Sequence, residues 1–243
     1  MNDKIYIVMP AYNESENIKS IVEQWHPIIE KIGGESKLLI VDDESKDDTY
    51  LKLQNLSKVY PFLEVITKPN TGHGRTCIFA YHYALDSKAD WIFQTDSDGQ
   101  TVPNEFWEFW LNRTNYNYII GKRENRLDGW DRVFVTKILK FILYLIFSVN
   151  VPDANTPFRL IKADTLSKLL KIIPSDSFLS NVLISTVIVK FKVPTKWIKI
   201  TFKPRQAGIN SINFKRIIKI GFRAIKDFVI LKKKIKENIY IFK

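Results

Sequence analysis

Residues 91–100 read WIFQTDSDGQ, a short apolar run followed by two aspartates and a glutamine. The run from Trp91 to Gln94 contains aromatic and β-branched side chains, which predicts a buried strand. In α/β sheets, ligands bind beyond the carboxyl ends of parallel strands. The stretch therefore predicts a strand of the central sheet and a functional site at its end.

The segments before this strand alternate between two patterns. Short apolar runs predict strands, whereas apolar residues spaced by three or four predict amphipathic helices. This alternation predicts right-handed βαβ crossovers and an α/β fold, with a mainly parallel twisted sheet flanked by helices. The expected strands are 4–9, 37–41, 63–67 and 91–94, and the expected helices are 15–32, 48–60 and 76–85.

Beyond residue 120 the pattern is less regular. Residues 166–173 and 179–189 fit either a helix or a strand, because their apolar residues follow no single period. The remaining expected segments are a polar stretch at 121–132, an apolar helix at 133–149, a loop at 151–159, a strand at 196–202, a polar loop at 204–211 and a basic amphipathic helix at 212–235.

The composition of the 243-residue chain suits a globular α/β protein with a substantial core. Its 45% hydrophobic and 13% aromatic content argues against disorder. The single cysteine, Cys77, excludes an internal disulfide framework and fits a reducing compartment. We find no secretory signal and no apolar run near the roughly 20 residues of a spanning helix, so we expect a cytoplasmic protein.

The net charge of +11 is concentrated near the C-terminus. Residues 213–243 contain ten Lys/Arg and two Asp/Glu, a net charge of +8, which leaves +3 for residues 1–212. A basic helix that also carries Ile and Phe fits an anionic membrane surface, which attracts each basic residue by about 1 kcal/mol. A solubilising helix face is the alternative interpretation.

Asp96 and Asp98 stand two residues apart at the expected strand end, and Gln100 follows. Oxygen ligands of this kind hold Mg²⁺ or Mn²⁺, which keep waters and complete their shell with substrate phosphates. An Asp-x-Asp pair alone is common in turns. Here the polar loops 12–14 and 42–44 are expected at the same sheet edge, which favours a site for a divalent cation and a diphosphate.

Residues 10–14 (PAYNE) and 41–45 (VDDES), together with DSDGQ at 96–100, resemble the donor-binding motifs of family 2 glycosyltransferases, which have the GT-A fold. The resemblance covers about residues 4–210. In that family the first two loops hold the nucleoside, and the Asp-x-Asp pair holds the metal and the diphosphate. The family's second loop usually reads Asp-Asp-Gly-Ser, and Glu44 replaces its glycine here.

The resemblance implies a metal-dependent transferase with a UDP- or GDP-sugar donor and a Mg²⁺ or Mn²⁺ cofactor. Residues 68–75 (KPNTGHGR) resemble the family's loop beside the donor, in which we interpret His73 as a hydrogen-bonded loop residue. The implied metal ligands are Asp96, Asp98 and Gln100, and the implied donor-binding residues are Pro10, Ala11, Tyr12, Glu14, Asp42, Lys68, Gly74, Arg75, Asp96 and Ser97.

The second half of the chain resembles the dolichyl- or polyprenyl-phosphate subgroup of this family. A lipid phosphate is already a nucleophile, so arginines would mainly position two anions and offset their repulsion. A sugar hydroxyl, as in capsule or lipopolysaccharide assembly, would need a general base, for which Asp153 is the candidate. The implied catalytic residues are Asp153, Arg123 and Arg132, and the implied acceptor-binding residues are Arg126, Arg159, Arg205 and Ser211.

We therefore expect a catalytic domain at 1–211, with a donor half at 1–120 and an acceptor half at 121–211, followed by a membrane-contacting segment at 212–243. The inner face of the cell membrane is the expected location, and 133–149 is either a second membrane helix or part of the core. A sugar-1-phosphate nucleotidyltransferase is disfavoured, because the glycine-rich, lysine-containing N-terminal loop expected of such an enzyme is absent from the sequence. A nucleic-acid-binding protein is disfavoured because the basic residues alternate with aliphatic ones.

Overall fold

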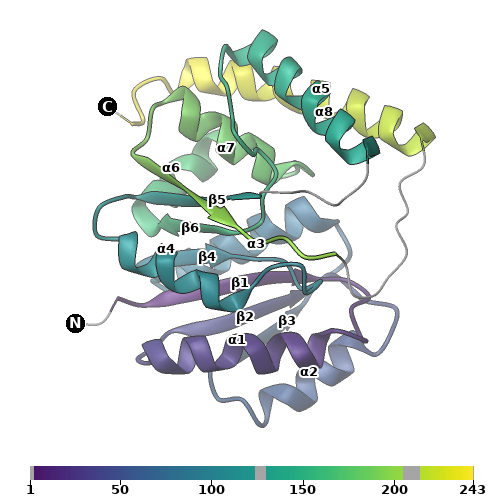
Figure 1. The fold of residues 1–243 in the computed structure, drawn as a ribbon, viewed down its shortest axis with the longest axis vertical. Coiled ribbons are helices and arrows are strands. Elements are labelled where there is room, and N and C mark those ends of the chain that lie inside the picture. Colours follow the sequence, from purple (N-terminus) through teal and green to yellow (C-terminus); the bar gives the residue numbers. More distant parts are fainter. Residues whose placement is uncertain (1–2, 124–129, 205–213, 243) are drawn as a thin grey trace.

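The structure is a computed structural model that describes residues 3–123, 130–204 and 214–242, except the side chains at 130–135, 214–220 and 222. A seven-stranded sheet in the order β3-β2-β1-β4-β6-β5-β7 lies at its centre (Figure 1). The strands are β1 (Ile5–Ala11), β2 (Lys37–Asp42), β3 (Leu63–Thr67), β4 (Trp91–Gln94), β5 (Tyr118–Arg123), β6 (Arg159–Lys162) and β7 (Thr195–Ile200).

Helices cover both faces of the sheet (Figure 1). A short 3₁₀ turn, η1 (Pro103–Glu105), precedes α4. The α-helices are α1 (Ile18–Ile32), α2 (Thr49–Ser57), α3 (His73–Asp86), α4 (Phe106–Asn112), α5 (Trp130–Phe147), α6 (Ala163–Ile172), α7 (Ser180–Lys190) and α8 (Phe214–Glu237).

The strand directions confirm the predicted, mainly parallel α/β sheet. β1 pairs in parallel with β2 and β4, and β2 pairs in parallel with β3. β6 is the reversed strand, since it runs antiparallel to both β4 and β5, while β7 is parallel to β5. Because Gln94 at the end of β4 pairs with Arg159 at the start of β6, the loop before β6 reaches the same sheet edge as the loop after β4.

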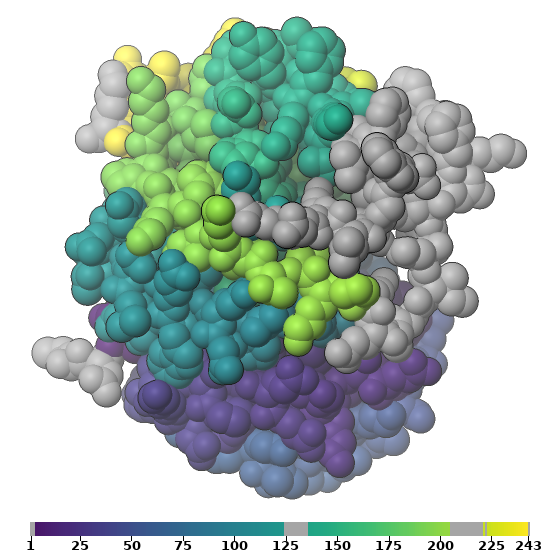
Figure 2. Space-filling view, viewed as in Figure 1, coloured from purple at the N-terminus to yellow at the C-terminus, as the bar shows by residue number. Residues whose placement is uncertain are grey.

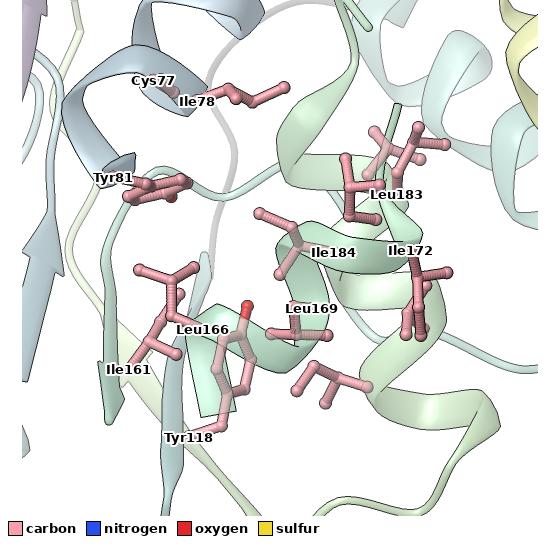
Figure 3. Close-up of a cluster of buried hydrophobic side chains, with 14 of the residues drawn as sticks. Cys77, Ile78, Tyr81, Tyr118, Ile161, Leu166, Leu169, Ile172, Leu183 and Ile184 are labelled. Atoms are coloured by element: carbon pink, nitrogen blue, oxygen red, sulfur yellow. The ribbon is translucent and has the colours of Figure 1, made fainter. Parts of the chain in front are cut away.

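Alternate residues of β1 supply two separate cores. Ile5, Ile7 and Met9 are buried in the core that α1 and α4 share, whereas Tyr6 and Val8 belong to the opposite core. That opposite core contains side chains of α3, α6, α7 and α8, and Figure 3 shows its part between the helices and strands β5 and β6. A strand buried on both faces has no polar alternation, which is why β1 reads as an unbroken apolar run.

Three elements differ from the sequence-based expectation. β5 begins three residues before the segment that we expected to be polar, and β6 and α4 were not predicted. Both segments with an ambiguous period are helices, α6 and α7. In α7 every residue from 180 to 188 is buried, so its apolar pattern has no helical period that could identify it.

His26 on α1 is 5% exposed and lies among aromatic rings, with centroid distances of 4.8 Å to Tyr60 and 5.9 Å to Phe62. Its Nε2 atom has no hydrogen-bond partner among the described residues. Burial lowers the pKa of His26, and the nearby Glu30 carboxylate acts in the opposite direction without reversing this. The folded state therefore disfavours the charged imidazole.

We expect His26 to make the protein less stable as the pH falls below about 6.5, the usual histidine pKa, because the unfolded chain then binds a proton that the folded state resists. Above that pH its contribution to stability is fully present. His26→Leu should weaken this pH dependence, measured as the urea midpoint at about pH 5.5 and pH 8. The exposed His82→Leu is the matched control. An unchanged pH dependence in His26→Leu would contradict the prediction.

Candidate active site

A cavity of about 410 Å³ lies at the sheet edge where β1, β2 and β4 end. The loops after β1, β2 and β4 and the start of α3 contribute to its wall. The predicted convergence of these three loops is therefore present in the structure. The residues that line it are Pro10, Ala11, Tyr12, Glu14, Asp43, Asn70, Gly72, His73, Thr76, Asp96, Ser97 and Asp98.

The loop after β1 is anchored to its neighbours mainly through its backbone. In the loop, the N–H groups of Asn13 and Glu14 donate to the hydroxyls of Ser45 and Thr49, each at 2.9 Å. Just before it, the Ser97 hydroxyl donates to the carbonyl of Pro10 in β1 at 2.8 Å. Tyr12 is 41% exposed and lines the cavity. An exposed aromatic ring on a fixed loop suits stacking against a flat ligand such as a nucleobase.

The loop after β2 places Asp43, rather than Asp42, in the cavity wall. Asp42 is the last residue of β2, is 1% exposed, and accepts a hydrogen bond of 2.9 Å from the Thr67 hydroxyl. The expected strand ended one residue earlier, at Val41, and so assigned Asp42 to the loop. In the structure Asp42 pairs with Ala11 of β1 and Thr67 of β3, which extends the strand by one residue and makes Asp43 the first residue beyond it.

Asp43 organises the neighbouring loop. Its carboxylate pairs with the Lys68 ammonium and accepts the backbone N–H groups of Thr71 at 3.0 Å and Gly72 at 2.8 Å. Burial opposes the charge on Asp43, but these hydrogen bonds, Lys68 foremost, outweigh it and lower the pKa of Asp43. The carboxylate therefore stays ionised and holds Gly72 at the cavity wall.

Glu44 occupies the position where the family usually has glycine. Its φ of 55° lies in the left-handed region, which costs a residue with a Cβ atom about 1–2 kcal/mol. Its carboxylate accepts the Asn70 N–H at 3.0 Å. The glutamate thus retains the turn and adds a link to the loop that Asp43 organises.

Lys68, Gly74 and Arg75 support the cavity from behind. Lys68 also donates to the Thr71 hydroxyl at 2.6 Å, so its ammonium is engaged within the loop. A Cβ atom on Gly74 would lie 2.3 Å from the Phe178 carbonyl oxygen, so close helix packing requires glycine there. The Arg75 Nε donates to a backbone carbonyl, that of residue 176, at 2.8 Å.

His73, which begins α3, contacts the first aspartate of the DSDGQ segment. Its Nε2 lies 2.9 Å from Asp96 Oδ1, and half of its side chain is exposed. Partial burial opposes the charge on His73, but Cys77 and Asp96 outweigh it and raise the pKa of His73 well above its usual value. Burial also opposes the charge on Asp96, which His73 and the arginines at 123 and 159 outweigh, so the pKa of Asp96 is lowered.

Two of the three implied metal ligands face the cavity. Asp96 and Asp98 line it, whereas the Gln100 amide donates to the Lys203 carbonyl at 2.9 Å and is 7% exposed. No group of three or more His, Cys, Asp or Glu side chains suited to a metal occurs within the described residues. Two carboxylates fit a divalent cation that completes its shell with substrate phosphates and waters.

Arg123 and Asp153 form a bidentate ion pair at the neighbouring part of the sheet edge. Nε and a terminal nitrogen of Arg123 each lie 2.8 Å from a different oxygen of Asp153, and both side chains are 7% exposed. The guanidinium carbon also lies 4.9 Å from the centroid of the Phe202 ring. Since both carboxylate oxygens contact Arg123, this arrangement suits positioning of the guanidinium more directly than proton abstraction.

Arg159 is inside the protein. It is 0% exposed and donates to the carbonyl oxygens of Thr156 at 3.1 Å and Asn181 at 3.2 Å, and to the Tyr118 hydroxyl at 3.0 Å. These bonds hold the loop before β6. Arg126, Arg205 and Ser211 lie outside the described residues, as does the side chain of Arg132.

The amino-acid sequence matches the family described as "Glycosyl transferase family 2" over residues 6–170. Undecaprenyl-phosphate 4-deoxy-4-formamido-L-arabinose transferase of Proteus mirabilis (strain HI4320) is 21% identical to the chain over 223 residues. That match covers 90% of this chain and 66% of the relative, so the chain spans just under two thirds of the relative's length.

Solved structures share the fold. Glucosyl-3-phosphoglycerate synthase from Mycobacterium tuberculosis, in complex with Mn²⁺, UDP and glucosyl-3-phosphoglycerate, matches with a TM-score of 0.68 and 13% identity, covering 96% of this chain and 80% of that one. TarS 1–349 from S. aureus matches with a TM-score of 0.56 and 16% identity, covering 82% and 60%. At these identities the likeness shows the fold alone, which is the predicted GT-A fold.

Asp43→Asn should destabilise the protein by about 3–5 kcal/mol, because it leaves the Lys68 ammonium buried without its carboxylate. Since the pKa of Asp43 is lowered on folding, its contribution is present above about pH 4 and is lost as the pH falls further. Urea unfolding at neutral pH measures the change. The double variant Asp43→Asn/Lys68→Met removes both charges and should recover part of the lost stability. If the changes in unfolding free energy of the two single variants simply add up in the double variant, Asp43 and Lys68 are not coupled.

Proposed function

The chain belongs to glycosyl transferase family 2, and we propose that it transfers a sugar, with inversion, from a UDP- or GDP-sugar to a lipid-linked acceptor in a reaction that uses a divalent cation. The observation that supports this best is the meeting of Tyr12, Asp43, Asp96 and Asp98 around one cavity. The cavity combines an exposed ring with carboxylates, as a site for a nucleoside and a metal-bound diphosphate requires.

The donor would lie with its base and ribose toward the first two loops and its diphosphate toward Asp96 and Asp98. Asp43 would act on the nucleoside side, and Asp42 would support that loop from within the sheet. Asp96 and Asp98 would hold Mg²⁺ or Mn²⁺, and such a cation, when bound, neutralises charge that develops on a leaving diphosphate. The Mn²⁺ and UDP bound to the mycobacterial synthase support this assignment.

A polyprenyl phosphate is the acceptor that we propose. The name of the Proteus mirabilis relative indicates an acceptor of this chemistry for that protein. In this chain, Asp153 contacts Arg123 with both carboxylate oxygens, which favours an acceptor that needs no deprotonation. A fixed guanidinium can position a phosphate and reduce its repulsion from the donor diphosphate. A sugar hydroxyl, with Asp153 as base, is the alternative acceptor.

We further propose that the protein binds the inner face of the cell membrane through two helices. These are α8, which lies in the membrane-contacting segment 212–243, and α5, which packs beside α8. The two helices lie side by side (Figure 1), and α5 is on the molecular surface at the top of Figure 2. Their exposed side chains include large apolar ones, Ile138, Phe141, Tyr144, Leu145, Ile225 and Val229, and the lysines Lys226, Lys232, Lys233 and Lys236.

This combination is what binding in the plane of the headgroups requires, because apolar side chains insert while lysines meet anionic lipid. No helix in the described part of the chain is long and apolar enough to span a bilayer. Phe141 and Leu145 are each 62% exposed, which favours the interpretation of 133–149 as a second membrane helix over a wholly buried core helix.

Incubating the protein with membranes, Mn²⁺ and radiolabelled UDP- and GDP-sugars should transfer label to the organic phase. Asp98→Ala should lower this transfer by about 100-fold or more, because one of the two cation-binding carboxylates is lost. Asp86→Ala, which removes an exposed aspartate at the end of α3, is the matched control. Label confined to aqueous glycan would reject the lipid acceptor, and full activity of Asp98→Ala would reject the metal site.

The triple variant Phe141→Ser/Tyr144→Ser/Leu145→Ser should bind vesicles that contain anionic lipid about tenfold or more weakly. Each change removes apolar groups that would insert into the membrane. Sedimentation with vesicles at low and high salt measures the effect. High salt should also weaken vesicle binding by the wild-type protein, because it screens the attraction between the lysines and anionic lipid. Val59→Ser/Leu111→Ser removes exposed apolar side chains elsewhere and should have little effect. Equal losses in both variants would argue against a specific membrane surface.

A further inference from the structure

We propose that residues 176–178, in the connection between α6 and α7, form a brace through which α8 positions the wall of the donor cavity. The proposal rests on the donor site described above and adds positioning residues that lie outside it. Ser177 is the central one, because it is fully buried between the first turn of α3 and the side of α8.

On one side, the brace touches the first turn of α3 through its backbone. The absence of a side chain at Gly74 lets the helix approach Phe178 so closely that a Cβ atom would lie 2.3 Å from its carbonyl oxygen and 2.8 Å from its Cα. One residue later, Arg75 donates to the carbonyl of Asp176 at 2.8 Å. Backbone atoms cannot yield as a flexible side chain does, so a shift of the brace would shift this turn.

The same turn of α3 forms part of the donor cavity. Gly72, His73 and Thr76 line it, and His73 contacts Asp96 across it at 2.9 Å. Cys77 lies directly behind, with its sulfur 3.8 Å from His73 Nδ1. The position of this turn therefore decides how the wall of the cavity meets the loop that carries Asp96.

On the other side, the brace is held by α8. The Ser177 hydroxyl donates to Asp227 Oδ2 at 2.8 Å and accepts the Leu179 N–H at 3.2 Å. The guanidinium of Arg223, one turn earlier on α8, lies 5.3 Å from the centroid of the Phe178 ring. Two neighbouring residues of the brace thus contact two positions on the same face of α8.

α8 is itself fixed in the core. Phe228 and Leu231 are 0% exposed, and the Phe228 ring lies 6.0 Å from that of Phe147 in an edge-to-face arrangement. A helix from the end of the chain therefore supports, through three residues, a cavity built by the first hundred. The helix that we assign to the membrane surface and the cavity that we assign to the donor share one packed connection.

Ser177→Ala removes the hydroxyl that joins the brace to α8. We expect it to raise the dissociation constants of UDP–Mn²⁺ and GDP–Mn²⁺, whichever the wild-type protein binds, by roughly 3- to 30-fold in calorimetric titration. Ser36→Ala is the matched control, because Ser36 is also buried and its hydroxyl accepts the Ile5 N–H at 3.2 Å at the other end of the sheet. Asp227→Asn keeps an oxygen acceptor and should bind nucleotide within about twofold of the wild type.

A second readout is independent of nucleotide. Cys77 is the single cysteine and is 0% exposed, so its rate of reaction with a thiol reagent reports opening of the α3 turn. Cys77 should react several-fold faster in Ser177→Ala than in Ser36→Ala. Each variant is measured at a urea concentration that lies the same amount below its own unfolding midpoint. If Ser177→Ala does not fold, Arg223→Gln, on the exposed part of α8, tests the second contact in the same way.

Two outcomes separate the brace from the donor site. If the wild-type protein binds neither nucleotide but Ser177→Ala still accelerates labelling of Cys77, the proposed donor site is wrong and the brace stands. If Ser177→Ala and Ser36→Ala match in both nucleotide affinity and thiol reactivity, the brace does not position the cavity and the proposal is overturned.

Discussion

The parallel pairing of β1 with β2 on one side and with β4 on the other is the constraint on which the site depends. Parallel strands that are neighbours in a sheet end at the same edge. The loops after Ala11, Asp42 and Gln94 therefore meet, although α1 separates the first two in sequence and α2, β3 and α3 separate the last two. The reversed direction of β6 then brings the loop that contains Asp153 to this edge as well. The residues that we propose for the donor and for the acceptor become neighbours through strand direction alone.

Bringing carboxylates together at one edge costs free energy unless each has its own partner. The structure meets this requirement separately for each. Asp42 accepts a threonine hydroxyl inside the sheet, Asp43 pairs with Lys68 and backbone N–H groups, and Asp96 faces His73. The acidic edge is therefore held in place by the protein's own groups, which is the preorganisation that a cation and diphosphate site needs.

The arginines show how one residue type serves different purposes according to its surroundings. Arg123 is fixed by a carboxylate at the sheet edge, and Arg159 is enclosed in the core with neutral oxygen partners among the described residues. Arg75 ties α3 to a backbone carbonyl. The sequence shows that all three residues are positively charged. The partners that each guanidinium contacts depend on which helix or strand packs beside it.

The sequence by itself determined the order of the first four strands and three helices, because hydrophobic period is a local property that needs no knowledge of the partner element. It also determined that three polar loops would converge, since this follows from parallel strand direction. Tertiary structure alone decided that Asp43 rather than Asp42 lines the cavity, that α7 is helical although buried on all sides, and that α8 reaches α3 through Ser177. Each of these depends on packing between segments distant in sequence, and no local period records such contacts.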